Sequence, residues 1–173
     1  MVHLTEPNLH TNNGAKMTNI IIHTETGHVY ITPTGFLVYA KNYYTAAINW
    51  QSDGNYSPVP YFLFSRSIEL GLKAFLLAKG EKIHVVKSKK IIGHNLIFAL
   101  RKAEFYSLSE FEHTTTEEEK ELQKANAYYN EKGFEYFDIK NLFHKKDMPD
   151  LKILQQYSEK LLRDITQFIL SST

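Results

Sequence analysis

The sequence predicts an all-α fold, an antiparallel bundle of about five helices preceded by a short N-terminal β-hairpin or extended arm. Apolar residues recur at helical spacing in five separate segments, which is typical of helices that bury one face. Glycine and proline separate several of these segments, and the short connections favour antiparallel neighbours. The chain shows no strand–helix–strand alternation and no glycine-rich phosphate loop, which argues against α/β nucleotide-binding folds.

Length and composition indicate one ordinary globular domain. The chain has 173 residues, 43% hydrophobic and 23% charged, with a net charge of +1, which argues against a general affinity for nucleic acid. Residues 1–18 are polar and are expected to form a flexible arm, and residues 19–173 a single helical domain. The absence of cysteine excludes disulfides and thiolate metal sites. With no long apolar run and no secretory signal pattern, the expected location is cytoplasmic.

The N-terminal part predicts a hairpin followed by a helix. Two β-rich runs, Ile20–Ile22 and Val29–Ile31, surround a polar turn. The first helix is expected over about Thr34–Gln51, where apolar residues lie on two sides. A helix that is apolar on two sides is usually buried on both. The first side comprises Leu37, Ala40, Tyr44, Ala47 and Ile48, and the second comprises Phe36, Tyr39, Tyr43 and Trp50.

Two further helices and a basic linker follow. The second helix is expected over about Tyr61–Lys79, because Gly80 readily adopts the left-handed conformation that ends helices. The lysine-rich linker of residues 81–92 can hold an extended piece at Ile83–Val86. The third helix is expected from about His94 to Leu108.

The last two helices begin with recognisable start signals. Three threonines at 114–116 each stand three residues before a glutamate, so a capping box is available in three registers for the fourth helix. That helix has a thin apolar face of Leu122, Ala125 and Tyr129. The fifth helix is expected from Asp147 nearly to the C-terminus, with proline in its first turn. The intervening segment 133–146 fits a strand, a turn or a brief helix.

A polar stripe marks the candidate site. Arg66, Glu69 and Lys73 share one face of the second helix, and His94 is expected beside them. Such a stripe in a cleft can position a phosphate or a carboxylate. It can equally serve structure, with Glu69 pairing with its neighbours and His94 fixing the linker to the helix. Asn95 either joins the site or caps the third helix.

The same region resembles HEPN domains. The resemblance is carried by residues 67–77, by the lysine-rich linker and by Gly93–Leu96, and the aromatic first helix and residues 127–130 suit the same pattern. It covers roughly residues 36–170. The resemblance implies a bundle of four or five helices, usually a homodimer. It also implies bacterial RNA or nucleotide handling, as in toxin–antitoxin and phage-defence systems.

The chain departs from the family's ribonuclease motif, an arginine followed by a histidine four to six residues later. No arginine here has a histidine at that spacing. The sequence therefore predicts a non-catalytic, homodimeric HEPN-like module without a cofactor, which binds RNA, a nucleotide or a protein partner. One alternative is a metal-independent ribonuclease with a divergent site of His94, Arg101 and Arg66. A second alternative is a helical scaffold subunit without a ligand.

Two further groups of residues remain as candidates. Lys87, Lys89 and Lys90 can contact phosphate or nucleic acid, although a solvated loop is the commoner role of such lysines. His23 and His28 flank the predicted turn. Two histidines without a third ligand do not make a metal site, so no metal is expected.

Overall fold

The computed structural model describes residues 20–24, 27–88, 90–135 and 148–171, and the predicted arm of residues 1–18 lies outside these ranges. Helices make up most of the described chain, which confirms the helical fold class. They are α1 (Pro33–Ile48), α2 (Val59–Ala78), α3 (Ile83–Lys87), α4 (Leu96–Phe105), α5 (Thr116–Tyr129) and α7 (Leu151–Ser171). Strands β1 (Ile20–Thr24) and β2 (Gly27–Ile31) pair antiparallel ahead of α1.

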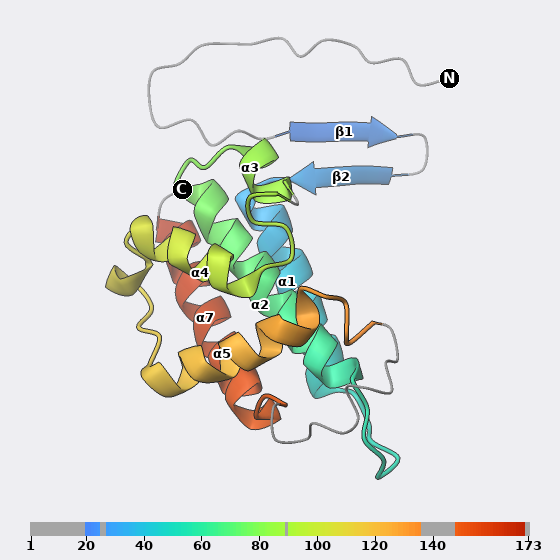
Figure 1. Cartoon of the computed structure of the whole chain (residues 1–173). Coiled ribbons are helices and arrows are strands. Elements are labelled where there is room, and N and C mark those ends of the chain that lie inside the picture. The colour runs from blue at the N-terminus through green and yellow to red at the C-terminus, as the bar shows by residue number, and fades with distance from the viewer. Residues whose placement is uncertain (1–19, 25–26, 89, 136–147, 172–173) are drawn as a thin grey trace, which may run out of the picture.

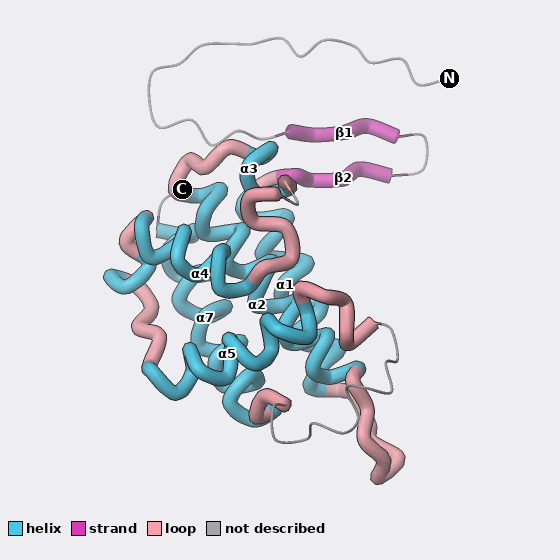
Figure 2. Tube along the Cα trace, in the orientation of Figure 1, coloured by secondary structure: helices cyan, strands magenta, loops and turns pink. Residues whose placement is uncertain are grey.

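Helix α2 lies at the centre of the bundle (Figure 1). It contacts α1, α4, α5 and α7, and α4 and α5 cross over α2 and α7 in the view of Figure 2. Because neighbours cover α2 on several sides, almost every side chain from Phe64 to Leu77 is buried. Arg66 is the partly exposed exception in that stretch. None of the helices in the described ranges is long and apolar enough to cross a bilayer.

The predicted antiparallel arrangement holds for α1 and α2 but is wrong for α2 and α7. Ser67 contacts α1 at Ala40 and α7 at Ser158. About two turns further along α2, Phe75 packs against Phe168. Residue numbers rise together in α2 and α7, so these two helices run in the same direction. The reason is the long connection through α3, α4 and α5, which returns the chain to the starting end before α7 begins.

A glycine permits the close packing of α2 against α7. A Cβ atom at Gly71 would lie 3.2 Å from Cδ2 of Leu162 and 3.6 Å from Cδ2 of Leu161. The absence of a side chain therefore lets two leucines of α7 approach the α2 backbone. Gly80 ends this part of the chain with a φ of +88°, as the sequence predicts.

The linker after α2 differs from the expected extended piece. Ile83–Val86 belongs to the short helix α3, with Val86 buried. A lone extended segment would leave its backbone groups without partners, whereas a helical turn satisfies them locally. The amides of Val85 and Val86 both donate to the carbonyl of Lys82, at 2.9 and 3.2 Å.

Helix α1 is less buried than its two apolar sides predict. Ile48, expected on the inner side, is 47% exposed, and Tyr39 on the second side is 45% exposed. Phe36 and Tyr43 are partly buried against the core. Only one face of α1 meets other described helices, because α2 and α7 both lie on the same side of it.

The helix starts follow their capping signals. Thr115 and Glu118 form the middle of the three available capping boxes. Asn95 caps α4 by accepting a hydrogen bond from the Phe98 amide at 2.9 Å. Helix α7 begins later than expected, at Leu151, because the Asp150 carboxylate accepts bonds from the two amides that follow it at 152 and 153.

Replacing Thr115 with alanine is expected to lower the free energy of unfolding by about 1 kcal/mol, because the Glu118 amide loses its partner. Urea denaturation measures the change. The neighbouring exposed Thr116 is the matched control, and its alanine variant should stay within about 0.5 kcal/mol of the wild type. Equal losses for both variants would show that the capping box contributes nothing specific.

Candidate functional site

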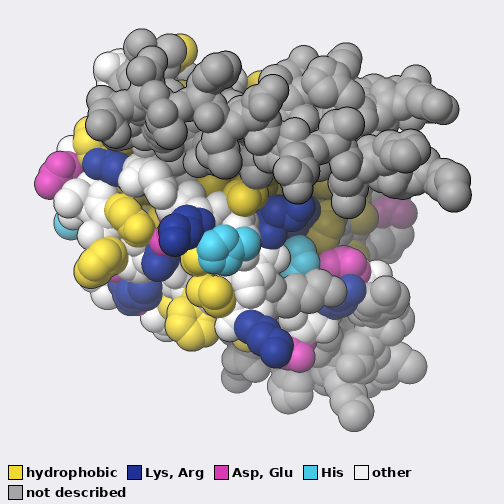
Figure 3. Space-filling view, turned by 90° about the horizontal axis from the view of Figure 1, so that it is seen from above, with side chains coloured by type: hydrophobic (Ala, Val, Ile, Leu, Met, Phe, Trp, Pro, Cys, Tyr) yellow, Lys and Arg dark blue, Asp and Glu magenta, His cyan; other side chains and the backbone are white. Residues whose placement is uncertain are grey.

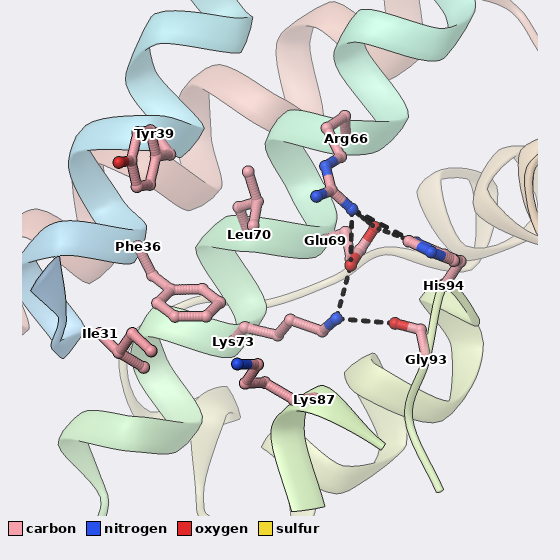
Figure 4. A pocket seen from close by; sticks show the side chains of 10 residues that line it. All are labelled: Ile31, Phe36, Tyr39, Arg66, Glu69, Leu70, Lys73, Lys87, Gly93 and His94. Carbon is pink, nitrogen blue, oxygen red and sulfur yellow. Dashed lines mark hydrogen bonds and ion pairs between the residues drawn. The ribbon is translucent and has the colours of Figure 1, made fainter. Parts of the chain in front are cut away.

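The candidate site centres on Glu69, a fully buried carboxylate on α2. Figure 4 shows Arg66 and Lys73 on either side of it along α2, with Gly93 and His94 facing it from the segment before α4. A buried carboxylate is costly unless donors surround it. The helical spacing of the stripe places two of these donors one turn away on the same face.

Every oxygen of Glu69 is engaged. Nη1 of Arg66 lies 3.1 Å from Oε1 and 2.9 Å from Oε2. Nζ of Lys73 donates to Oε1 at 2.5 Å and to the Gly93 carbonyl at 2.7 Å. The hydroxyl of Tyr129, from α5, donates to Oε2. The cluster therefore joins α2, α5 and the segment before α4.

His94 completes the cluster through one ring nitrogen. Its Nδ1 lies 3.2 Å from Oε2 of Glu69 and 3.3 Å from Nη1 of Arg66. The nitrogen donates to the carboxylate when it carries a proton and accepts from the guanidinium when it does not, so the tautomer decides between the two bonds. The ring also meets Tyr129 edge-on, with centroids 5.9 Å apart.

These contacts fix the ionisation of the cluster. Burial alone would raise the pKa of Glu69, but the hydrogen bond from His94 and the charges of Lys73 and Arg66 lower it to about 2. Burial and the nearby carboxylate raise the pKa of Tyr129 well above its ordinary value. At neutral pH the carboxylate is therefore ionised and the phenol keeps the proton that it donates.

A pocket of about 340 Å³ opens beside this cluster. The lining residues come from the end of β2, from α1, α2 and α3, and from the segment before α4, and Figure 4 labels all of them. They are Ile31, Phe36, Tyr39, Arg66, Glu69, Leu70, Lys73, Lys87, Gly93 and His94. The volume lies at the lower end of the range for small-molecule sites.

The pocket carries an excess of positive charge. Its lining holds three cationic side chains, those of Arg66, Lys73 and Lys87, against the single carboxylate of Glu69. In Figure 4 the second terminal nitrogen of Arg66 points away from Glu69 toward Leu70. Figure 3 views this end of the molecule and shows Lys and Arg side chains beside histidines. An anion entering the pocket would therefore meet several N–H donors.

The structure brings together four of the predicted site residues and separates the fifth. Arg66, Glu69, Lys73 and His94 form the cluster, and the role foreseen for His94 as a link between linker and helix fits its bond to Glu69. Asn95 caps α4 instead of lining the pocket.

The remaining candidates divide between two surfaces. Lys87 lines the pocket, whereas Lys90 and Arg101 line a separate groove along α4. Arg101 forms ion pairs with Glu104 and Glu119 on the exposed side of α4, so it does not join Arg66 and His94. Lys89 lies outside the described residues.

Tyr129 is the member of the Glu69 cluster that the sequence analysis does not include. Its position on the apolar face of the fourth helix was evident, and a buried tyrosine hydroxyl needs a partner. This need for a hydrogen-bond partner is the one feature of the sequence that could have placed Tyr129 in a polar cluster. The identity of the partner depends on how α5 crosses α2, which the spacing within α5 does not specify.

Comparison of the chain with protein-family models, with curated proteins and with solved structures finds no match in any of the three.

Proposed function

We propose that this chain is a HEPN-like, non-catalytic and homodimeric binding module whose pocket beside Glu69 holds a nucleotide. The observation that carries the proposal is the charge of the pocket, with three cations and one carboxylate that its neighbours already satisfy. A ligand with a phosphate group would balance the remaining positive charge. The resemblance suggests a role in bacterial toxin–antitoxin or defence systems.

The donors of the pocket suit a phosphate. Lys73 has three N–H groups and uses two of them for Glu69 and Gly93. Arg66 contacts Glu69 and His94 through Nη1, and its other terminal nitrogen points away from Glu69, toward Leu70. Lys87 forms no ion pair with any described residue. These three side chains can bind a phosphate without disturbing the Glu69 cluster.

The opposite wall of the pocket suits a base. Phe36 and the half-exposed Tyr39 supply aromatic surface from α1. Stacking of a nucleobase on an aromatic side chain contributes about 1–3 kcal/mol and tolerates any base. The pocket is large enough for one nucleotide unit, so a mononucleotide or one terminal unit of RNA fits better than a longer segment.

Binding is favoured over catalysis by the state of the polar residues. Glu69 accepts bonds from Arg66, Lys73 and Tyr129, and its neighbours hold its pKa at about 2, so it is a poor acceptor for a substrate proton. Arg101, which the divergent ribonuclease site requires, lines another groove. We therefore expect no cleavage of single-stranded RNA by the purified protein in the absence of metal.

Isothermal titration calorimetry with the four ribonucleoside monophosphates tests the proposal. We expect each to bind, with affinity that falls as salt rises, and the corresponding nucleosides without phosphate to bind at least about tenfold more weakly. Replacing Lys87 with glutamine should weaken the monophosphates by about tenfold, because an exposed cation that faces the phosphate is lost.

The matched control is Lys90→Gln, an exposed lysine three residues later that lines the α4 groove instead. It should leave nucleotide affinity unchanged. Absence of binding at millimolar nucleotide would refute the proposal, as would equal losses for both lysine variants. Metal-independent RNA cleavage that His94→Ala abolishes would favour the ribonuclease alternative.

A further inference from the structure

The charge of the pocket beside Glu69 can be counted from its described lining residues. Arg66, Lys73 and Lys87 each carry one positive charge, and Glu69 carries the one negative charge. Three cations against one carboxylate leave a net charge of +2. The three cations come from two separate elements, α2 and α3, which Figure 4 shows on facing sides of the pocket.

The other titratable groups of the cluster do not lower this charge near neutral pH. Burial and the carboxylate of Glu69 raise the pKa of Tyr129 well above its ordinary value, so its phenol stays neutral. Glu69, with its pKa held at about 2, already carries its full negative charge. His94, whose Nδ1 contacts Glu69 and Arg66, is either neutral or positive, so protonation of its ring only adds positive charge.

Two of the three cations are largely shielded from water. The side chain of Lys73 is 8% exposed and that of Arg66 is 27% exposed. Water and salt screen such charges less than they screen surface charges. Lys87 is exposed, and in Figure 4 its side chain points from α3 toward Phe36 and Lys73. The attraction for an entering anion should therefore depend strongly on how many charges the anion carries.

The phosphate of a nucleotide carries a different charge at a chain end and inside a chain. A phosphomonoester has nearly two negative charges at neutral pH and three terminal oxygens that accept hydrogen bonds strongly. A phosphodiester within RNA has one negative charge and two such oxygens. The monoester thus matches both the net charge of the pocket and its three cationic donors, whereas the diester leaves one positive charge unbalanced.

We propose that the pocket beside Glu69 selects a terminal phosphomonoester, as on a free nucleotide or an RNA end, over the phosphodiester of an internal nucleotide. This inference rests on the proposed nucleotide site and names the form of phosphate that the site takes. Lys87 determines the preference, because Arg66, Lys73 and Glu69 without it leave a net charge of only +1.

Isothermal titration calorimetry of the full chain at pH 7.5, above the second phosphate pKa of about 6, tests the selection. Adenosine monophosphate is compared with adenosine 5′-sulfate, which has nearly the same shape and one negative charge fewer. We expect the monophosphate to bind at least about tenfold more tightly than the sulfate. The dinucleoside ApA, which has only an internal phosphodiester, should also bind at least about tenfold more weakly than the monophosphate.

The ratio of the two affinities tests the role of Lys87 independently of any general loss of binding. In Lys87→Gln the monophosphate should lose more affinity than the sulfate, so that the preference falls to about threefold or less. The matched control Lys90→Gln, which changes an exposed lysine of the α4 groove, should keep the preference of the wild type. A preference that persists in Lys87→Gln would overturn the role of Lys87.

Failure of this inference is distinguishable from failure of the nucleotide site. Equal affinity for adenosine monophosphate and adenosine 5′-sulfate, or equal affinity for the monophosphate and ApA, would overturn the selection while leaving a nucleotide site. Absence of monophosphate binding at millimolar concentration would refute the site itself. Titration with 5′-phosphorylated ApA identifies the source of the ligand. Affinity close to that of the monophosphate supports an RNA end, and much weaker binding supports a free nucleotide.

Discussion

Replacing Glu69 with alanine is expected to lower the free energy of unfolding by about 3–5 kcal/mol, because it leaves buried positive charge without a counter-ion. Lys73 has a side chain only 8% exposed and would keep a single acceptor, the Gly93 carbonyl. Tyr129 and Arg66 would also lose the carboxylate to which they donate. For a domain of this size the melting temperature should fall by about 6–20 °C. Urea denaturation and thermal unfolding at pH 7 measure the two quantities.

The matched control is a carboxylate in an exposed ion pair. Glu104 pairs with Arg101 on the surface of α4, and Glu104→Ala should cost at most about 1 kcal/mol. A loss below about 1 kcal/mol for Glu69→Ala as well would contradict the structural importance of the cluster.

A double variant distinguishes the loss of side-chain packing at Glu69 from the cost of leaving the buried charge of Lys73 unpaired. Glu69→Met restores the volume but still leaves Lys73 without its counter-ion, so it should remain strongly destabilised. Adding Lys73→Met removes that charge and should recover part of the stability, because apolar replacements of a whole buried pair are often tolerated. No recovery in the double variant would mean that the unpaired charge of Lys73 is not what destabilises Glu69→Met.

The features of the fold that the sequence could predict are those determined within a few residues. The end of α2 depends on one left-handed glycine, Gly80, and the start of α5 depends on the bond between Thr115 and the Glu118 amide. The shared direction of α2 and α7 could not be foreseen. It depends on how residues 79–150 travel along the bundle, and no apolar pattern within either helix reports that direction.

The candidate site likewise has residues that the sequence could group and residues that only the packing of separate helices brings together. Arg66, Glu69 and Lys73 could be grouped because helical spacing alone puts them on one face. Their closeness to His94 follows from a short return of the chain after α2. Tyr129 and the aromatic wall of Phe36 come from helices whose crossing positions depend on packing across the whole core, so single-segment reasoning did not connect them with Glu69.

Glu69 should also make the protein sensitive to acid. The hydrogen bond from His94 and the charges of Lys73 and Arg66 outweigh burial and hold the pKa of Glu69 at about 2, below its ordinary value of 4.5. Because the folded-state pKa is the lower one, the carboxylate stabilises the fold fully above about pH 4.5 and loses that contribution as the pH falls toward 2. The difference corresponds to about 3 kcal/mol, of which about 2 kcal/mol is lost by pH 3.

Denaturation of the wild type and of Glu69→Gln between pH 7 and pH 3 isolates this contribution. Glu81 and Glu118 also have lowered pKa values, through Lys102 and Lys160 respectively, and they titrate in both proteins. The difference in stability between the two proteins therefore removes the contributions of Glu81 and Glu118 and reports the carboxylate of Glu69 together with its contacts. We expect this difference to shrink by about 2 kcal/mol at pH 3. Arg66, Lys73, His94 and Tyr129 surround this carboxylate only in the folded chain, so its pKa should differ between the folded and unfolded states. A stability difference that stays constant from pH 7 to pH 3 would contradict this, because it would mean that Glu69 has the same pKa in both states.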